Sequence, residues 1–255
     1  MIVINPPLPA AITNWINAAP LTENSGQSGA QTYFIDGDKP AYLKIAPKGQ
    51  LKKAADMQSY FASKDLSADM CLYESLDRDY LIVSAIAGED GVSDKHVAQP
   101  ARLAEQFGLS LKRLHATSLA DCPEQNRMAA WLDMVPDADF RQDHLDELSH
   151  IIGKVDAASA RAEILANRDI IKTDALIHGD YCLPNIILDN WRFSGFIDIA
   201  DAGVGDRHYD IAWGLWTIAW NLKLSKYADV FLDAYGRDQI DMDRLRICIL
   251  LAAMD

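Results

Sequence analysis

The stretch from His178 to Asp198, HGDYCLPNIILDNWRFSGFID, constrains both the fold and the chemistry of this chain. Two short apolar runs flank a turn sequence at Asp189-Asn190, a pattern typical of a β-hairpin. Such a hairpin would bring Asn185 and Asp198 together at one end, with Asp180 on the loop leading into it. The sequence therefore predicts three polar side chains gathered beside a hairpin.

These three side chains suit phosphoryl transfer. A carboxylate such as that of Asp180 accepts a hydroxyl proton, while Asn185 and Asp198 offer oxygen ligands for a hard divalent cation. We predict Asp180 as the catalytic residue and the other two as ligands of Mg²⁺, because zinc sites use nitrogen and sulfur donors. The alternative is a polar hairpin in an unrelated α/β domain.

Length and composition favour a globular protein of one large domain or two lobes. The chain has 255 residues, of which 49% are apolar, and no apolar run reaches the roughly 18 residues of a membrane span. The first residues lack the basic and long apolar regions of a signal peptide. The four cysteines are scattered, as reduced thiols are in cytosolic proteins. We expect a cytoplasmic protein that does not enter a membrane.

The net charge of −13 argues against nucleic acid as a partner, because no basic stripe is visible. An acidic surface can attract a cationic small substrate, but ordinary solubility explains the charge equally well. The chain also lacks the GxxxxGK[ST] phosphate loop, which excludes the P-loop class of nucleotide-binding proteins. We expect a small-molecule substrate that carries a hydroxyl group and no protein partner.

The order of predicted elements indicates two parts. Strands are expected over 41–45 and 80–86 with one helix over 48–63, and helices dominate after residue 100. Glycines and charges follow the buried strand 80–86, which favours a hinge there. We predict a nucleotide-binding lobe over 1–86 and a catalytic, substrate-binding lobe over 87–255. Lys44, on a strand among apolar residues, is predicted to bind nucleotide phosphates.

The pattern HGDxxxxN followed by IDxxxxGxxDRxxDIA resembles the catalytic region of the aminoglycoside phosphotransferases, especially the kanamycin and neomycin 3′-kinases. The matching residues are His178, Gly179, Asp180, Asn185, Ile197, Asp198, Gly203, Asp206, Arg207, Asp210, Ile211 and Ala212. The resemblance implies an α+β, two-lobed, protein-kinase-like fold with a small β-rich N-lobe and a larger, mainly helical C-lobe. It also implies transfer of the γ-phosphate of ATP, or of GTP, to a substrate hydroxyl.

The same resemblance assigns nucleotide-binding residues. Ser28 lies in a small-residue loop, matched to GxSxA, that covers the phosphates beside Lys44. Tyr42 is placed against the adenine, and the backbone of Ser84 and Ile86 at the adenine edge. Beyond the catalytic region, Asp206, Arg207 and Asp210 are expected to brace the catalytic loop, with Asp206 as the cap of the helix that follows.

The helix after this cap carries Trp213, Trp216 and Trp220 at helical spacing, a stripe that usually packs in a core. His115, at the end of the helix predicted from residue 100, is expected to serve packing or capping.

One departure from the family concerns Lys44. Ala54 stands where the family's helix carries the glutamate that pairs with this lysine. Asp56 cannot replace it, because two residues span about 200° around a helix. The sequence predicts a less constrained Lys44 and weaker catalysis, or a substitute acid from elsewhere.

Other departures concern the substrate. Family acids that bind aminoglycoside amines are replaced at Arg141-Gln142, at Trp216-Thr217 and at the C-terminus. Asp143 and Asp255 are the acids that could compensate, and Trp216 could line an aromatic pocket. The alternatives are an aminoglycoside 3′-kinase, a kinase for another hydroxyl metabolite, and a catalytically weak nucleotide-binding pseudokinase. Retention of the catalytic and metal residues argues against the last.

Overall fold

The computed structural model describes residues 7–24, 30–223 and 226–254. The chain divides into two compact units, residues 1–87 and 88–255. Within the described ranges, no helix is both long and apolar enough to cross a membrane.

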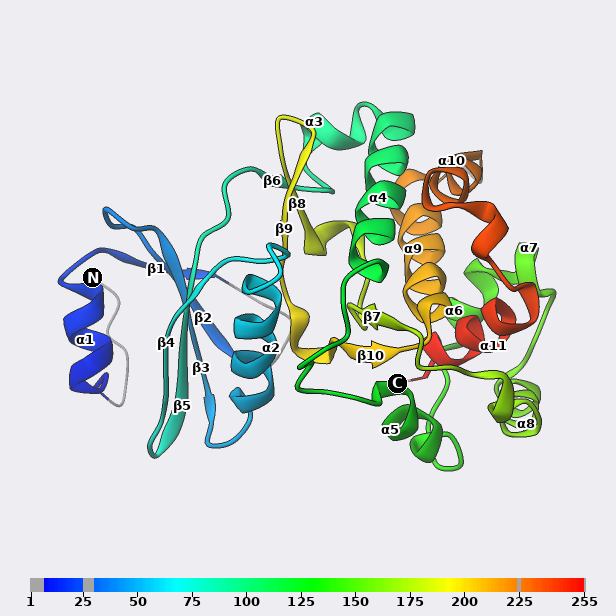
Figure 1. Ribbon diagram of the computed structural model, residues 1–255, viewed down its shortest axis with the longest axis horizontal. Helices are drawn as coiled ribbons and strands as arrows, with labels where there is room; N and C mark the ends of the chain where they lie inside the picture. Colours follow the sequence, from blue (N-terminus) through cyan, green and yellow to red (C-terminus); the bar gives the residue numbers. More distant parts are fainter. Residues whose placement is uncertain (1–6, 25–29, 224–225, 255) are drawn as a thin grey trace. The chain divides into compact units, whose positions relative to one another are not determined.

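The first unit is an antiparallel sheet with a helix on each face (Figure 1). Its five strands run in the order β1-β2-β3-β5-β4. The elements are α1 (Ala10–Ile16), β1 (Leu21–Asn24), β2 (Gln31–Ile35), β3 (Ala41–Pro47), α2 (Lys52–Ala62), β4 (Met70–Ser75) and β5 (Arg78–Ser84).

Alternation along β3 separates the two faces of this sheet. Leu43 and Ile45 are buried in the core that includes α1, and successive strand residues point to opposite faces. Lys44 therefore lies on the other face, where its cross-strand partner Leu81 packs in a cluster with Ala55 of α2. The sheet thus presents Lys44 on the side covered by α2.

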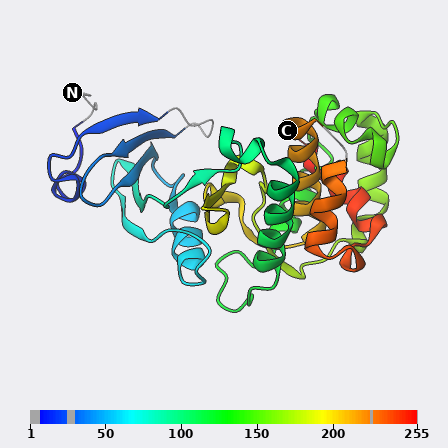
Figure 2. The same ribbon diagram turned by 90° about the horizontal axis from the view of Figure 1, so that it is seen from above.

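The second unit is mainly helical. Its helices are α3 (Asp94–Val97), α4 (Pro100–His115), α5 (Arg127–Met134), α6 (Gln142–Glu147), α7 (Ser149–Ile152), α8 (Ala157–Ala166), α9 (Arg207–Leu222), α10 (Lys226–Tyr235) and α11 (Met242–Ala252). Helices α4, α9 and α10 lie side by side (Figures 1 and 2), and α11 packs against α9. The 3₁₀ turns are η1 (Arg168–Ile170), η2 (Leu183–Asn185), η3 (Ile199–Asp201) and η4 (Arg237–Gln239).

Two small antiparallel sheets hold the loops of the second unit. One contains β6 (Glu89–Asp90), β8 (Ile186–Asp189) and β9 (Arg192–Phe196), and the other contains β7 (Ala175–Ile177) and β10 (Gly203–Gly205). The β8–β9 hairpin confirms the predicted hairpin. Its turn residues Asn190 and Trp191 have φ of 47° and 66°, as a two-residue turn of this kind requires.

Two predicted boundaries are wrong. The helix expected from residue 48 begins at Lys52, because the buried Asp79 carboxylate accepts the Leu51 amide at 2.9 Å just before it. The strand expected over 80–86 spans Arg78–Ser84 and ends where its pairing with β3 ends. The local apolar pattern could not predict these two boundaries, because each depends on a contact with a residue far away in the sequence.

Candidate active site

Asp180 and Asn185 meet directly on the loop after β7. The Asn185 side-chain amide donates from Nδ2 to Asp180 Oδ2 at 2.8 Å and to the Asp180 carbonyl at 2.9 Å. Asn185 is buried, so its orientation is fixed. Because its nitrogen points at Asp180, its Oδ1 faces the other way, as a metal ligand would require.

Asp198 lies at the same end of the hairpin. The amide of the preceding residue, Ile197, donates to the Asn185 carbonyl at 3.0 Å. His178 bridges the two loops, since its Nε2 donates to the Ile197 carbonyl at 2.9 Å and its Nδ1 accepts the Asp180 amide at 3.3 Å. The predicted catalytic residue and both predicted metal ligands are therefore carried by two loops joined through His178.

Ala200 stands where the family has a glycine, and because alanine adopts positive φ less readily, the sequence predicts a different bend in the loop after Asp198. The left-handed residue is Asp198 itself, with φ of 55°, and η3 follows it. Aspartate adopts this conformation more readily than most residues. Because Ala200 has no positive φ, its replacement of the family glycine adds no backbone strain here.

A buried carboxylate braces the catalytic loop from α9. Asp210 is 0% exposed and accepts the His178 amide at 2.7 Å and the Gly179 amide at 2.9 Å. His115 Nε2 lies 3.2 Å from Asp210 Oδ2, and His115 Nδ1 lies 2.9 Å from the Tyr235 hydroxyl. These contacts confirm the predicted bracing role of Asp210 and the structural role of His115.

Gly179 brings the two loops into close approach. Its φ is +84°, and a Cβ there would lie 2.3 Å from the Asp201 carbonyl oxygen. A side chain at this position would meet both the unfavourable backbone region and the neighbouring loop. The glycine of the sequence motif is therefore required by geometry.

Cys182 is a site residue that the sequence analysis did not identify. Its thiol donates to Asp180 Oδ1 at 3.2 Å, so each oxygen of the Asp180 carboxylate receives one side-chain hydrogen bond. Burial, with Asp180 nearby, raises the pKa of the Cys182 thiol well above its usual value. The only sequence signal was its place two residues after the catalytic aspartate.

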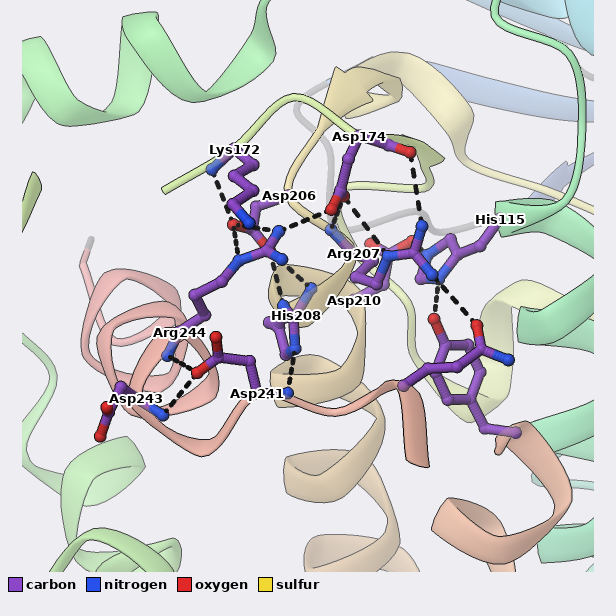
Figure 3. Close-up of polar contacts among 12 residues, drawn as sticks. His115, Lys172, Asp174, Asp206, Arg207, His208, Asp210, Asp241, Asp243 and Arg244 are labelled. Carbon is purple, nitrogen blue, oxygen red and sulfur yellow. Dashed lines mark hydrogen bonds and ion pairs between the residues drawn. The ribbon is translucent and has the colours of Figure 1, made fainter. Parts of the chain in front are cut away.

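A charged network anchors the start of α9 (Figure 3). Asp206 caps the helix by accepting the His208 amide at 3.0 Å, which confirms the predicted cap, and its other oxygen accepts Arg244 Nε at 2.9 Å. Arg244 also pairs with Asp174 at 2.9 Å. Burial would raise the pKa of Asp206, but hydrogen bonds from His208 and the Lys172 amide hold it below the usual 3.8. The network ties α11 to the segment before the catalytic loop.

The predicted nucleotide residues lie in the first unit. Tyr42 and Lys44 are two residues apart on β3 and share a face of the sheet, and the Tyr42 ring lies 5.2 Å from that of Phe34. Ser84 ends β5, and its amide already donates to Asp69 at 3.0 Å. Of its two backbone polar groups, the carbonyl is therefore the one left as a candidate for contact with an adenine. Ile86 follows β5, and Ser28 lies outside the described residues.

Ala54 lies on the face of α2 that covers the sheet, as expected for the position where the family carries its lysine-pairing glutamate. Ala54 is half-buried against the cluster that contains Leu81, the strand partner of Lys44. Asp56 pairs instead with Lys52 on the exposed side of the helix. Asp56 therefore points away from the sheet, as its spacing predicted.

The three places where family acids are replaced meet in the second unit. The Arg141 amide donates to the Ala253 carbonyl at 2.8 Å, and the His144 ring lies 4.4 Å from that of Trp216. Asp143, predicted as a substrate residue, is exposed and pairs with Arg141 at 2.8 Å, whose hydrogen bond lowers the Asp143 pKa. Asp255 lies outside the described residues.

The tryptophans of α9 are only partly buried. Trp216 is half-buried and stacks on Trp220, which is 50% exposed, with ring centroids 5.8 Å apart. The expectation that this stripe packs in the core is therefore wrong for Trp220. Its helical spacing could not distinguish a core stripe from an aromatic surface.

Comparison with known proteins identifies the class. The model of a phosphotransferase enzyme family matches residues 20–248. A probable aminoglycoside 3′-phosphotransferase of Lactococcus lactis subsp. lactis (strain IL1403) is 38% identical over 94% of this chain and 92% of its own length. An aminoglycoside 3′-phosphotransferase of Niallia circulans is 28% identical over 95% of each chain.

Solved structures share the fold. A crystal structure of an aminoglycoside 3′-phosphotransferase of type VIII superposes with a TM-score of 0.74 at 22% identity, covering 94% of this chain and 95% of that one. An aminoglycoside phosphotransferase from Streptomyces rimosus, in complex with ADP and streptomycin, gives 0.68 at 21% identity, covering 95% and 96%. The predicted kinase-like α+β fold is confirmed.

The family match and the curated relatives define a phosphotransferase with an alcohol group as acceptor. The chain belongs to the phosphotransferase enzyme family, and the resemblance inferred from its catalytic motif is confirmed.

Proposed function

We propose that this protein is an aminoglycoside 3′-phosphotransferase that uses ATP, with GTP as the alternative donor, and Mg²⁺. The observation that carries the proposal is the contact of Asp180 with Asn185 beside Asp198. The name of the Lactococcus relative supports the choice of acceptor. ATP is a cytoplasmic metabolite, so we place the reaction in the cytoplasm.

In the proposed reaction, Asp180 orients the acceptor hydroxyl and accepts its proton as the phosphoryl group transfers. A loose transition state leaves most of the catalysis to positioning and charge neutralisation. Asp210 fixes the backbone just before Asp180, and the His178 ring accepts the amide of Asp180 itself. Lys44 is proposed to restrain the phosphates, Ser28 to cover them, and Tyr42, Ser84 and Ile86 to hold the adenine.

The oxygen donors fit Mg²⁺. Asn185 turns its carbonyl oxygen away from Asp180, and Asp198 is the second proposed ligand. No group of three or more His, Cys, Asp or Glu side chains suited to a metal occurs among the residues with described positions. This agrees with a cation held by one or two protein ligands and by phosphates and water. Bound there, Mg²⁺ would neutralise charge on the phosphates.

A kinase for a less cationic hydroxyl compound is the second candidate. It is favoured by one observation: Arg141 already pairs with Asp143, at a place where the family binds amines with acids. Trp216, whose ring lies 4.4 Å from that of His144, stacks on Trp220, and such an aromatic surface suits sugar rings regardless of charge. Asp143, Trp216 and Asp255 are the proposed substrate contacts under both candidates.

The test is ATP consumption by the purified protein with a panel of aminoglycosides and neutral polyols, followed by mass spectrometry and NMR of the product. We expect phosphorylation of kanamycin at its 3′-hydroxyl with a micromolar KM. Matched amikacin and neamine reactions test tolerance around that hydroxyl. Turnover restricted to neutral polyols would replace the first proposal with the second. Expression in a sensitive bacterium should raise kanamycin resistance.

A further inference from the structure

The catalytic carboxylate is held by a chain of side chains that reaches back into α9. Cys182 donates its thiol proton to Asp180 Oδ1 at 3.2 Å. The Thr217 hydroxyl of α9 lies beside this residue, since it accepts the amide of the next residue, Leu183, at 3.2 Å. Cys182 is 7% exposed and Thr217 is 0% exposed, so both side chains are shielded from bulk water. The Asp180 carboxylate is thereby linked to a buried position on the helix behind it.

The direction of the hydrogen bonds between Thr217, Cys182 and Asp180 follows from counting donors and acceptors. The Thr217 hydroxyl accepts the Leu183 amide at 3.2 Å and Asn221 Nδ2 at 3.0 Å. A hydroxyl has two acceptor sites and one proton, so its proton must point elsewhere, and the sulfur of the neighbouring Cys182 is the acceptor that we assign to it. The thiol then gives its own proton to Asp180. Every bond points toward the carboxylate, and bonds aligned in this way reinforce one another.

We propose that Cys182, oriented by Thr217 and Asn221, is a positioning residue for the reaction: it fixes the rotation of the Asp180 carboxylate for attack by the acceptor hydroxyl. Asn185 holds Oδ2 and Cys182 holds Oδ1, so rotation about the terminal bond would break both contacts. This inference rests on the proposed function only in taking Asp180 as the group that meets the acceptor.

The place of Thr217 on α9 also links this chain of hydrogen bonds to the proposed substrate contact Trp216. Thr217 belongs to the Trp216-Thr217 pair, which stands where the family has an Arg-Asp pair. Trp216 faces His144 of α6, whereas Thr217 is fully buried and contacts the catalytic loop. Adjacent residues of α9 thus lead to two places: Trp216 to the proposed substrate contacts and Thr217 to the loop that carries the Asp180 carboxylate.

The experiment compares Cys182→Ala, which removes the donor, with Cys182→Ser, which keeps one of similar size. Steady-state kinetics with ATP and kanamycin give kcat and both KM values, and thermal unfolding checks the fold. We expect Cys182→Ala to lower kcat about tenfold, the effect of one hydrogen bond to a charged group, with both KM values unchanged. Cys182→Ser should restore kcat to within about threefold. Cys122→Ala is the control, because Cys122 is also buried and donates to the Glu124 carbonyl.

A second pair of variants tests the link to α9. Thr217→Ser keeps the hydroxyl and should retain kcat, whereas Thr217→Val should lower it. The double variant Cys182→Ala/Thr217→Val should be no slower than Cys182→Ala alone, because both changes break one chain. Multiplying losses would contradict the chain.

The proposal is overturned if Cys182→Ala has wild-type kcat, if Cys182→Ser is equally impaired, or if the loss appears in the KM for ATP. If the wild-type protein phosphorylates no aminoglycoside, the proposed acceptor fails separately. The same variants are then compared in basal ATP hydrolysis, where water takes the acceptor's place beside Asp180. The same ranking of Ala below Ser is expected there, and equal rates would overturn the proposal.

Discussion

Replacing Asp210 by asparagine should disrupt the loop that carries Asp180. The carboxylate uses both oxygens, one for the His178 amide at 2.7 Å and the other for the Gly179 amide at 2.9 Å. An asparagine has one acceptor oxygen, so its NH₂ group must face one of these two N–H donors. The change therefore removes a buried charge-assisted bond and leaves an orphaned amide.

The magnitude follows from these contacts. A hydrogen bond to a charged group contributes about 1.5–3 kcal/mol, and an unsatisfied buried donor costs about 1–3 kcal/mol. A combined loss of about 3 kcal/mol should lower the unfolding temperature by roughly 6–12 °C in a chain of this size. Because the displaced amides of His178 and Gly179 immediately precede Asp180, kcat should fall as well.

The assay is thermal unfolding followed by circular dichroism, together with steady-state kinetics at a temperature where the variant is folded. Asp238→Asn is the matched control, since it removes the same charge from an exposed position on η4. An unchanged unfolding temperature and kcat in Asp210→Asn would refute the bracing role. Equal losses in the control would show that net charge, and not the contact, is responsible.

Three further predictions concern other parts of the chain. Ala54→Glu should raise turnover or tighten ATP binding, because α2 faces the side of the sheet that carries Lys44; no change would mean that another group already restrains the lysine. Gly179→Ala should lower both stability and kcat, since its Cβ would meet the Asp201 carbonyl, whereas Gly49→Ala shares the positive φ in open space and should leave kcat intact. Asp206 has a lowered pKa, so its carboxylate stabilises the fold above about pH 4, and this contribution is lost as the pH falls through the folded pKa. The difference in unfolding temperature between wild type and Asp206→Asn should therefore shrink from pH 7 toward about pH 2.5, and a constant difference would contradict the role of the charge.

Local sequence predicted the parts of the fold and site that depend on neighbours in the chain. The β8–β9 hairpin follows from its apolar runs and turn, and the facing of Lys44 follows from strand alternation. The contact of Asn185 with Asp180 spans only five residues, which is why spacing alone anticipated it.

Contacts between segments that lie far apart in the sequence could not be predicted. Thr217 reaches Leu183 across 34 positions, and Arg244 reaches Asp174 across 70. Nothing in the spacing of these residues indicates their partners, because tertiary packing of α9 and α11 brings them together. The exposure of Trp220 was missed for the same reason, since helical spacing does not state what covers a face.

The central claim is that Asp180 performs phosphoryl transfer to an aminoglycoside hydroxyl, and Asp180→Ala tests it most directly. Kanamycin phosphorylation and Mg·ATP affinity are measured on the same preparations of wild type and variant. We predict that kcat falls about 10²–10⁴-fold, the usual contribution of a positioned base, while the Kd for Mg·ATP stays nearly unchanged. Turnover within a few-fold of wild type would contradict the account.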